Sequence, residues 1–274
     1  MSYRFLKGHG TENDFVLLPD HAGDVHGELP SARVAALCDR RAGIGADGVL
    51  RVVRSAALAE SADLADSAEW FMDYRNADGS LSEMCGNGIR VFARHLVDEG
   101  LAAGGRPIHI GTRAGVKSVL VAEDGPITVE MGSPHVFDES VIGLGRWSWP
   151  ARHISMGNPH AVVFVDSLDE LGDLGSLSYD HDVYPDGVNV EFVRRVGEGY
   201  LSLRVHERGV GETRSCGTGA CAAMVAAALA DGLGNDTSYD VEVPGGLLRI
   251  TWTAGDQVLL SGPAEIVAAG LTDL

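Results

Sequence analysis

The stretch Cys85–Gly88 reads Cys-Gly-Asn-Gly, and Cys-Gly-Thr-Gly returns at Cys216–Gly219. A run with helical patterning follows each stretch, Ile89–Asp98 and Ala220–Ala230, so each cysteine is expected at the start of a helix. One such motif in each half of the chain predicts two related domains that face each other across a cleft. Two thiols on opposite sides of one carbon can remove a proton from one face and return one to the other. Inversion of a stereocentre requires this arrangement.

The duplication extends beyond the two cysteine motifs. A shift of 131 residues places one cysteine on the other and Asn76 on Glu207. Upstream, Asp47–Val49 matches Asp186–Val188 at a shift of 139, so the first half carries about eight extra residues. We place them in Arg54–Glu69, which is rich in Ala, Ser and Asp and is typical of a surface insertion. The alternative is chance similarity of glycine-rich turns, and the collinear order of the matches argues against it.

Composition indicates a globular protein and limits its partners. The 274 residues are 45% apolar, enough for two moderate cores. The net charge of −18 argues against nucleic acid as a partner. The longest apolar stretch is Ala220–Ala230, too short to span a bilayer, and Met1–Gly8 lacks the apolar core of a signal peptide. We therefore expect no membrane partner and a cytoplasmic protein with reduced thiols.

Residue spacing argues against a bound metal or cofactor. The four cysteines form no Cys-x-x-Cys pair, so we expect no metal site. The two lysines, Lys7 and Lys117, lie outside the duplicated motifs, which disfavours pyridoxal phosphate because that cofactor needs a Schiff-base lysine. The stretch Gly43–Gly48 fits Gly-x-Gly-x-x-Gly, but a helical segment precedes it and a strand-like run follows. A dinucleotide site needs the reverse order, so turn chemistry is the better interpretation.

The remaining pattern predicts an α+β fold. We expect two pseudo-symmetric domains, each an antiparallel strand layer wrapped around a central helix, with a further helix near Ser31–Cys38 and a serine cap at its start. The first domain should comprise residues 1–118, and the second residues 119–261. Strands are expected at Phe15–Leu18, Gly48–Val53, Val119–Val121, Ile127–Met131, Ala161–Val165, Val188–Val193, Tyr200–His206, Leu247–Trp252 and Gln257–Ser261.

A cysteine at a helix start is suited to acid–base chemistry. The unpaired N–H groups and partial positive charge there stabilise a thiolate, so we expect lowered pKa values for Cys85 and Cys216. The glycine that follows lets a ligand approach the backbone, and the exposed amides can hold a carboxylate. A single Cys-Gly-x-Gly is better interpreted as a buried small residue at a helix start. Two copies in register favour the catalytic interpretation.

Residues near the motifs add candidates. Asn76 and Glu207 each stand nine residues before a cysteine, where Glu207 could tune a thiol or bind an ammonium group. Arg208 could pair with a carboxylate in a forked geometry. His160, after Asn158 and Pro159, could modulate a cysteine. The alternatives are turn chemistry for the first three and a structural role for the histidine. Cys38 and Cys221 are expected in the cores.

Together these motifs resemble the diaminopimelate epimerase family over nearly the whole chain. That family contains cofactor-independent epimerases of lysine and peptidoglycan precursor synthesis. The motifs that carry the resemblance are Asn13–Phe15 after Gly10, Gly43–Gly48, Asn76–Ser80, Cys85–Gly88, Gly157–His160, Glu207–Gly209 with Gly211–Thr213, and Cys216–Gly219.

The resemblance implies a role for each matching residue. Cys85 and Cys216 would be the acid–base pair, and His160 and Glu207 would adjust the thiols. The reacting carboxylate would bind the backbone amides of Gly86, Asn87, Gly217 and Thr218. The resemblance further implies an amino-acid substrate, no cofactor, a homodimer and a C-terminal strand, 262–274, that returns to the first domain. The remaining substrate contacts would come from Asn13, Asn76, Asn158, Asn189, Glu207 and Arg208.

Two departures from the family pattern stand out. Gly48 stands where many members carry Gln, so that side-chain contact is absent, and Thr11-Glu12 replaces a more usual Leu-Gly before Asn13. A related racemase or isomerase on the same fold is the alternative. Proline racemase relatives usually carry His where Asn87 stands, and phenazine-type isomerases lack the thiol pair. A catalytically inactive amino-acid-binding protein is the alternative from another class, and the intact cysteine pair argues against it.

Overall fold

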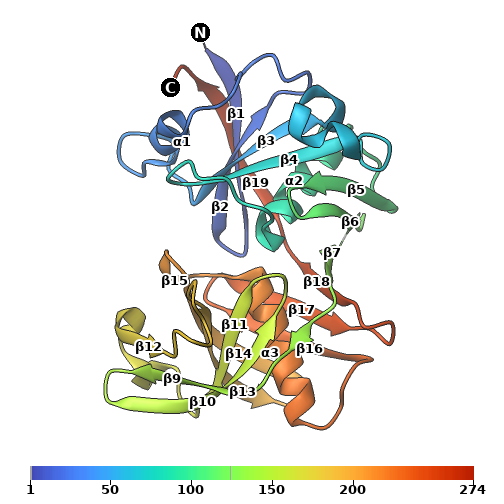
Figure 1. Ribbon diagram of the computed structural model, residues 1–274. Helices are drawn as coiled ribbons and strands as arrows, with labels where there is room; N and C mark the ends of the chain where they lie inside the picture. Colours follow the sequence, from blue (N-terminus) through green and yellow to red (C-terminus); the bar gives the residue numbers. More distant parts are fainter. Residues whose placement is uncertain (1, 124) are drawn as a thin grey trace. The chain divides into compact units, whose positions relative to one another are not determined.

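The computed structural model describes residues 2–123 and 125–274 and divides the chain into two compact units (Figure 1). Unit 1 runs to Val129 and takes back Gly262–Leu274, and unit 2 is Glu130–Ser261. The expected boundary at 118/119 falls inside β6 (Gly115–Val121), which pairs with β5 (Pro107–Thr112) and so stays in unit 1. No helix in the described part of the chain is long and apolar enough to cross a membrane.

Unit 1 is a strand layer around the helix α2 (Gly86–Asp98). Its strands pair in the order β19, β1, β2, β3, β4, β5, β6, β7. α2 contacts strands from both ends of this order, because its buried face is broad and includes Ile89, Phe92 and Leu96. The other elements are β1 (Tyr3–Gly10), β2 (Asn13–Pro19), α1 (Ser31–Cys38), β3 (Gly48–Arg54), β4 (Trp70–Asn76), β7 (Ile127–Gly132) and β19 (Glu265–Thr272).

Unit 2 repeats this plan around α3 (Gly217–Ala230), which is apolar all round and buried along most of its length. Its main strands pair in the order β10, β11, β13, β14, β16, β17, β18. They are β10 (Trp147–Ser155), β11 (Pro159–Phe164), β13 (Asn189–Gly197), β14 (Tyr200–Glu207), β16 (Thr237–Val243), β17 (Gly246–Trp252) and β18 (Val258–Gly262), with β8 (His135–Val136), β9 (Ser140–Leu144), β12 (Leu177–Tyr179) and β15 (Gly211–Thr213) at the margins.

The two units share one order of strand pairing, as the duplication predicts. From β1 and from β10 onward, successive pairs are antiparallel, parallel, antiparallel, parallel, antiparallel. The expectation of antiparallel layers is therefore wrong in detail, and the sheets are mixed. The parallel steps occur where a long crossover intervenes, such as the one through α1 between β2 and β3. The two-unit α+β class itself is confirmed.

Strand register corrects the alignment of the two halves. Gly48 lies opposite Asn76, and the pairing of β13 with β14 sets Asn189 level with Glu207. Gly48 therefore corresponds to Asn189, not to Gly187. The extra residues lie between β3 and β4, where Ser55–Ala57 and Ala59–Leu64 form 3₁₀ turns at the predicted insertion. A tight connection replaces them between β13 and β14.

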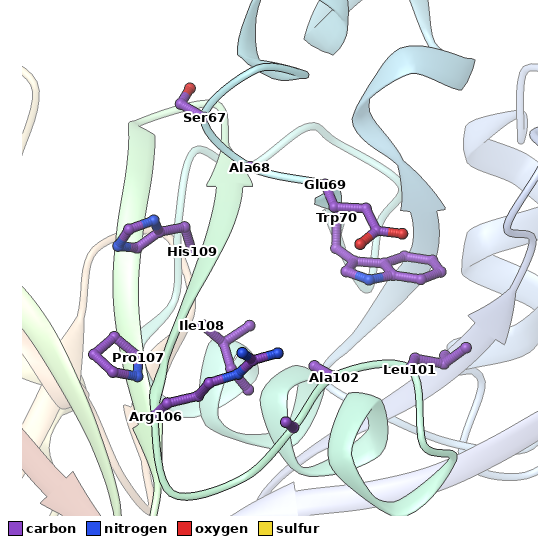
Figure 2. A pocket seen from close by; sticks show the side chains of 11 residues that line it. Ser67, Ala68, Glu69, Trp70, Leu101, Ala102, Arg106, Pro107, Ile108 and His109 are labelled. Atoms are coloured by element: carbon purple, nitrogen blue, oxygen red, sulfur yellow. The ribbon is translucent and has the colours of Figure 1, made fainter.

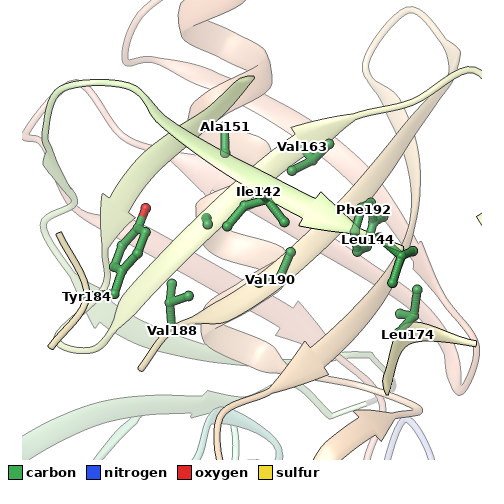
Figure 3. Packing of buried hydrophobic residues seen from close by; sticks show 10 residues of the cluster. Ile142, Leu144, Ala151, Val163, Leu174, Tyr184, Val188, Val190 and Phe192 are labelled. Carbon is green, nitrogen blue, oxygen red and sulfur yellow. The ribbon is translucent and has the colours of Figure 1, made fainter. Parts of the chain in front are cut away.

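The outer face of each sheet has its own core. In unit 2, Ile142, Val190 and Phe192 pack with Tyr184 and Leu174 in an apolar cluster (Figure 3). In unit 1, α1 packs Val34 and Leu37 over Val49 in the corresponding layer. The α1 start differs from expectation: Pro30 is the N-cap without a side-chain bond, and Ser31 Oγ donates to Gly79 O instead.

A buried ionic group adjoins this layer in unit 1. The Arg51 and Asp20 side chains pair at 2.6 Å, and Asp73 accepts from Arg75 at 3.2 Å and from Arg113 at 2.6 Å. Arg51, Asp20 and Asp73 are at most 1% exposed. The inner faces of the two sheets hold α2 and α3. On the outer faces, unit 2 is stabilised by its apolar cluster, whereas unit 1 has this buried ionic group beside its apolar cluster.

A strained two-residue turn positions Asn13. Gly10 pairs with Asn13, and the residues between them, Thr11 and Glu12, have φ values of 50° and 61°. Positive φ at both central positions is the type I′ hairpin turn, which favours Asn and Gly. Thr11 is held there by a hydrogen bond from Arg90 Nη2 to its hydroxyl, at 3.3 Å.

Candidate active site

Cys85 is the N-cap residue of α2, as predicted. Its Sγ accepts a hydrogen bond from Gly88 N at 3.4 Å, in the place that a serine or aspartate oxygen usually takes. A Cβ at Gly88 would lie 3.3 Å from Leu50 and 3.4 Å from Phe15, so the first turn packs directly on the sheet. Cys85 is half-buried.

Asn13 and Asn87 join the Cys85 thiol in one hydrogen-bonded group. Asn13 Oδ1 accepts from Cys85 Sγ at 3.6 Å and from Asn87 Nδ2 at 3.2 Å. Asn13 Nδ2 donates to Asp47 Oδ2 at 2.8 Å, and Arg90 Nη1 donates to Asn87 Oδ1 at 3.0 Å. Asp47 lies in two of the sequence motifs, but neither Asp47 nor Arg90 was predicted as a site residue. Asp47 orients the side chain of Asn13, a predicted substrate contact, and Arg90 orients the side chain of Asn87, whose backbone amide was predicted to bind the carboxylate.

Asn76 lies at the end of β4 and is held by its own turn. Asn76 Nδ2 donates to Ser80 Oγ at 2.9 Å, and Gly79, with φ of 85°, closes the turn. Turn chemistry, the alternative interpretation, is therefore present. It does not exclude a substrate contact, because the side chain remains half-exposed.

Cys216 is the N-cap residue of α3 and repeats the geometry of Cys85. Its Sγ accepts from Gly219 N at 3.4 Å, and Thr218 Oγ1 lies 3.5 Å from the sulfur. Gly217 and Thr218 then occupy the first turn of α3, as Gly86 and Asn87 occupy that of α2. The first N–H groups of an α-helix have no acceptor within the helix, so both turns are suited to a carboxylate.

The expected lowering of the Cys216 pKa is wrong. Cys216 is only 6% exposed, and its burial, with the charges of Glu207 and Glu191, holds the pKa of the thiol well above that of a free cysteine. The Thr218 hydroxyl and the Gly219 N–H act in the opposite direction and are outweighed. Loss of solvation and two nearby carboxylates exceed the partial charge at a helix end. Cys216 is therefore a thiol at neutral pH.

Glu207, Arg208 and Asn189 form a second group at the ends of β13 and β14. The Thr213 hydroxyl donates to Glu207 Oε1, and Arg208 N donates to Asn189 Oδ1 at 2.9 Å. The Arg208 side chain is exposed and donates to Asp186 O at 3.2 Å, beside Gly187. Within residues 2–123 and 125–274, its guanidinium pairs with no carboxylate.

His160 is fully buried and bonded on both ring nitrogens. Nδ1 lies 2.7 Å from Glu191 Oε1, and Nε2 lies 3.0 Å from Asn158 Oδ1. Asn158 is half-buried. Glu191 was not predicted as a site residue from the sequence. A signal was present, since Glu191 is an acidic residue within the otherwise apolar run Val188–Val193.

The two remaining cysteines lie in the cores, as expected. Cys38 and Cys221 are buried, and burial raises the pKa of Cys38 to about 11. A surface pocket of about 300 Å³ in unit 1 lies apart from all the predicted site residues (Figure 2). Its walls are Ser67–Trp70, Leu101–Ala103 and Arg106–His109. The pocket contains no cysteine, so the two helix starts remain the candidate site.

Comparison with known proteins identifies the family. The model of the family described as diaminopimelate epimerase matches residues 5–137 and 152–267. The chain belongs to the diaminopimelate epimerase family. A diaminopimelate epimerase of Streptomyces coelicolor is 54% identical over 98% of this chain and 95% of its own. One from Thermobifida fusca is 50% identical over 97% of each chain. The family resemblance inferred from the motifs is confirmed.

Solved structures support the fold of this family member. A phenazine biosynthesis protein of the PhzF family from Bacillus anthracis has a TM-score of 0.72 at 16% identity, with 100% of both chains covered. A hydroxyproline epimerase from Agrobacterium vitis with bound trans-4-hydroxy-L-proline has a TM-score of 0.68 at 15% identity, covering 99% of this chain and 92% of that one. At such identities the likeness concerns the fold alone.

Proposed function

We propose that this chain interconverts L,L- and meso-2,6-diaminopimelate without a cofactor, using Cys85 and Cys216 as the acid–base pair. The observation that carries the proposal is the repeated N-cap cysteine, whose sulfur accepts an N–H of the first helical turn in each unit of a diaminopimelate epimerase family member. The reaction belongs to the synthesis of lysine and peptidoglycan precursors.

The two thiols serve opposite faces of the same α-carbon. One, as thiolate, takes the proton from the carbon, and the other, as thiol, donates a proton from the opposite side and inverts the centre. The raised pKa of Cys216 makes it the proton donor of the resting enzyme, which leaves Cys85 as the base. After one turnover the roles are exchanged, so both directions of the reaction use the same pair.

The carboxylate next to the reacting carbon binds the first-turn amides of α2 and α3. Gly86 and Asn87 supply one set and Gly217 and Thr218 the other, and the helix ends stabilise the negative charge that develops when the proton leaves. Asn13, Asn76, Asn158, Asn189 and Glu207 contact the amino groups and the carboxylates. Arg208 pairs with the distal carboxylate, because its guanidinium is exposed and its one contact among the described residues is with a backbone carbonyl.

Incubation with L,L-diaminopimelate in deuterated water tests the proposal. The reduced, chelator-treated enzyme without pyridoxal phosphate should produce the meso isomer with deuterium at the inverted carbon. A Cys85→Ala, Cys216→Ala double variant is the matched control. L-Lysine, which lacks the distal carboxylate, should react poorly. Absence of the meso isomer, or equal rates with lysine, would refute the proposed function.

We further propose a cytoplasmic homodimer. Reactive thiols suit a reducing compartment. The last strand, β19, exposes Val267 and Leu271, which are 56% and 72% accessible, on a strand that pairs with β1. Exposed apolar side chains on such a strand are typical of an interface. Light scattering should give twice the mass of one chain, and Leu271→Glu should shift the protein towards the monomer. A wild-type monomer would exclude this assembly.

A further inference from the structure

Glu191 is a fully buried carboxylate beneath the catalytic end of α3. It has 0% exposure, as has its partner His160, and the two meet at 2.7 Å. On β13 it points to the inner face, towards α3, while its neighbours Val190 and Phe192 lie in the outer apolar cluster. A charged group in such a place is costly unless it is compensated.

Only part of this carboxylate is compensated by hydrogen bonds. Among the described residues no group bonds to Glu191 Oε2, although that atom is buried. The corresponding residue of unit 1, by strand register, is Leu50, which packs against the first turn of α2. The fold therefore accommodates an apolar side chain at this position. A buried and incompletely bonded acid in its place indicates a role other than packing.

The start of α3 lies directly on the carboxylate. A Cβ at Gly219 would be 2.6 Å from Glu191 Oε1, so only glycine allows this approach. The N–H of the same Gly219 donates to Cys216 Sγ. The helix end partly compensates the charge of Glu191, and Glu191 in turn places a negative charge close to the Cys216 sulfur. Burial and the Glu207 charge act on this thiol in the same direction.

We propose that Glu191 is a positioning residue for proton transfer: it fixes His160 and Asn158 in line and places its carboxylate against the first turn of α3, next to Cys216. The line runs from Glu191 Oε1 through His160 Nδ1 and Nε2 to Asn158 Oδ1, an amide that we assign to the substrate. Glu191 itself is buried and does not touch the substrate. The expected effect of Glu191 on the epimerisation rate rests on the proposed function, whereas its expected effect on the reactivity of Cys216 does not.

The test uses Glu191→Gln, which keeps the shape and removes the charge. The matched control is Asp240→Asn on β16, which removes one charge from a half-exposed pair with Arg249 of β17. Alkylation of Cys216 by iodoacetamide, followed by peptide mass mapping at pH 8, reports the thiolate. If the pKa of Cys216 falls by one unit, the thiolate fraction rises about tenfold and the nucleophilicity of the thiolate falls about threefold. The rate of Cys216 alkylation should therefore rise about threefold. The control should match wild type.

Kinetics and spectroscopy complete the test. The variant should lose about tenfold in kcat with little change in KM, less than the ~10²–10⁴-fold that loss of an acid or base costs. Nitrogen-15 shifts of His160 should change in Glu191→Gln only. Unchanged alkylation and His160 shifts in a folded variant would overturn the inference. If wild type fails to epimerise diaminopimelate while Cys216 alkylation still rises, the proposed function fails and the role of Glu191 at the thiol stands.

Discussion

The two helix starts carry the same cysteine in the same geometry, but the strands below them differ. Strand register matches three positions of unit 1, on β2, β3 and β4, with three positions of unit 2, on β11, β13 and β14. Around Cys85 all three are neutral, and around Cys216 all three are ionisable. The pairs are Phe15 with His160, Leu50 with Glu191, and Asn76 with Glu207.

The two units have kept the same backbone position for the cysteine, but the side chains beneath it have diverged. The backbone fixes a sulfur at the first turn of a helix in both units, because that depends on strand order and a Cys-Gly-x-Gly sequence. The protonation state depends on the side chains beneath the helix, and a symmetric fold can therefore hold one thiol ready to donate. An inverting enzyme must start each turnover with one thiolate and one thiol, and the charged groups below Cys216 favour the thiol there.

Removal of either cysteine should abolish the reaction. We expect Cys85→Ala and Cys216→Ala each to lower epimerisation by at least ~10⁴-fold, the upper end for a single acid or base, because one-sided transfer cannot invert the centre. Isomer analysis by chiral chromatography measures this loss. Each variant can still exchange solvent hydrogen on the face that it retains. Near-normal inversion in either variant would mean that the two helix starts are not partners.

The outer faces should respond differently to loss of a charge. Asp73→Asn breaks a buried ionic group in unit 1 and should cost ~3–5 kcal/mol of unfolding free energy. Asp240→Asn in unit 2 removes a half-exposed pair and should cost less than ~1 kcal/mol. Urea denaturation followed by fluorescence measures both. Equal costs would mean that the ionic group of unit 1 contributes no more than a surface pair.

Acid should destabilise unit 1 through α2. Burial lowers the pKa of His95 from 6.5 to about 4, whereas the matching residue of α3 is Ala226. The neutral form is favoured in the fold, so this stability is present above pH 6.5 and lost as the pH falls towards 4. The loss at pH 4.5 is ~2–3 kcal/mol. Hydrogen exchange of α2 peptides should show it in wild type and not in His95→Leu. An identical acid response of the variant would exclude His95 as the cause.

Exchange of one residue between the units should weaken the asymmetry. Glu207→Asn gives unit 2 the residue of unit 1, removes a charge that raises the pKa of Cys216, and should lower kcat ~10–100-fold. As the pH is raised, the activity of the variant should begin to decline at a lower pH than that of the wild type. The reason is that Cys216, with a lower pKa, loses its proton at a lower pH. Rate–pH profiles measure both effects. A profile that is unchanged in both rate and position would mean that Glu207 has no part in proton transfer.

The smallest effect is expected at the turn before Asn13. Glu12→Gly relieves a positive φ, and we expect a gain of up to ~1 kcal/mol in stability. The connection at the matching place in unit 2 already has Gly157, with φ of 96°. Thermal unfolding measures the gain, with Glu28→Gly in an exposed loop as the control for added chain flexibility. A loss of stability at Glu12 would show that this turn is not strained.

The sequence predicted the features that depend on local pattern. The three helices, both N-cap cysteines, the turn at Gly43–Gly48 and the two-unit α+β class were all accessible in this way. It did not predict β1, β4, β5, β10 or β16. In β16 the alternation of Tyr239, Val241 and Val243 with polar residues was a signal that could have been used. The pKa of Cys216 could not be derived from the motif, because it depends on burial and on Glu191, which long-range strand pairing brings to the thiol.

The return of β19 to β1 has a consequence for the order in which the protein can be made. Unit 2 is continuous in the chain, whereas unit 1 needs a strand that is translated after all of unit 2. On the ribosome, the first half must therefore wait with the open side of β1 unpaired until β19 emerges. The unit that begins first is completed last. Chaperones and nascent-chain aggregation should consequently act on the early half, contrary to the usual order of domain folding.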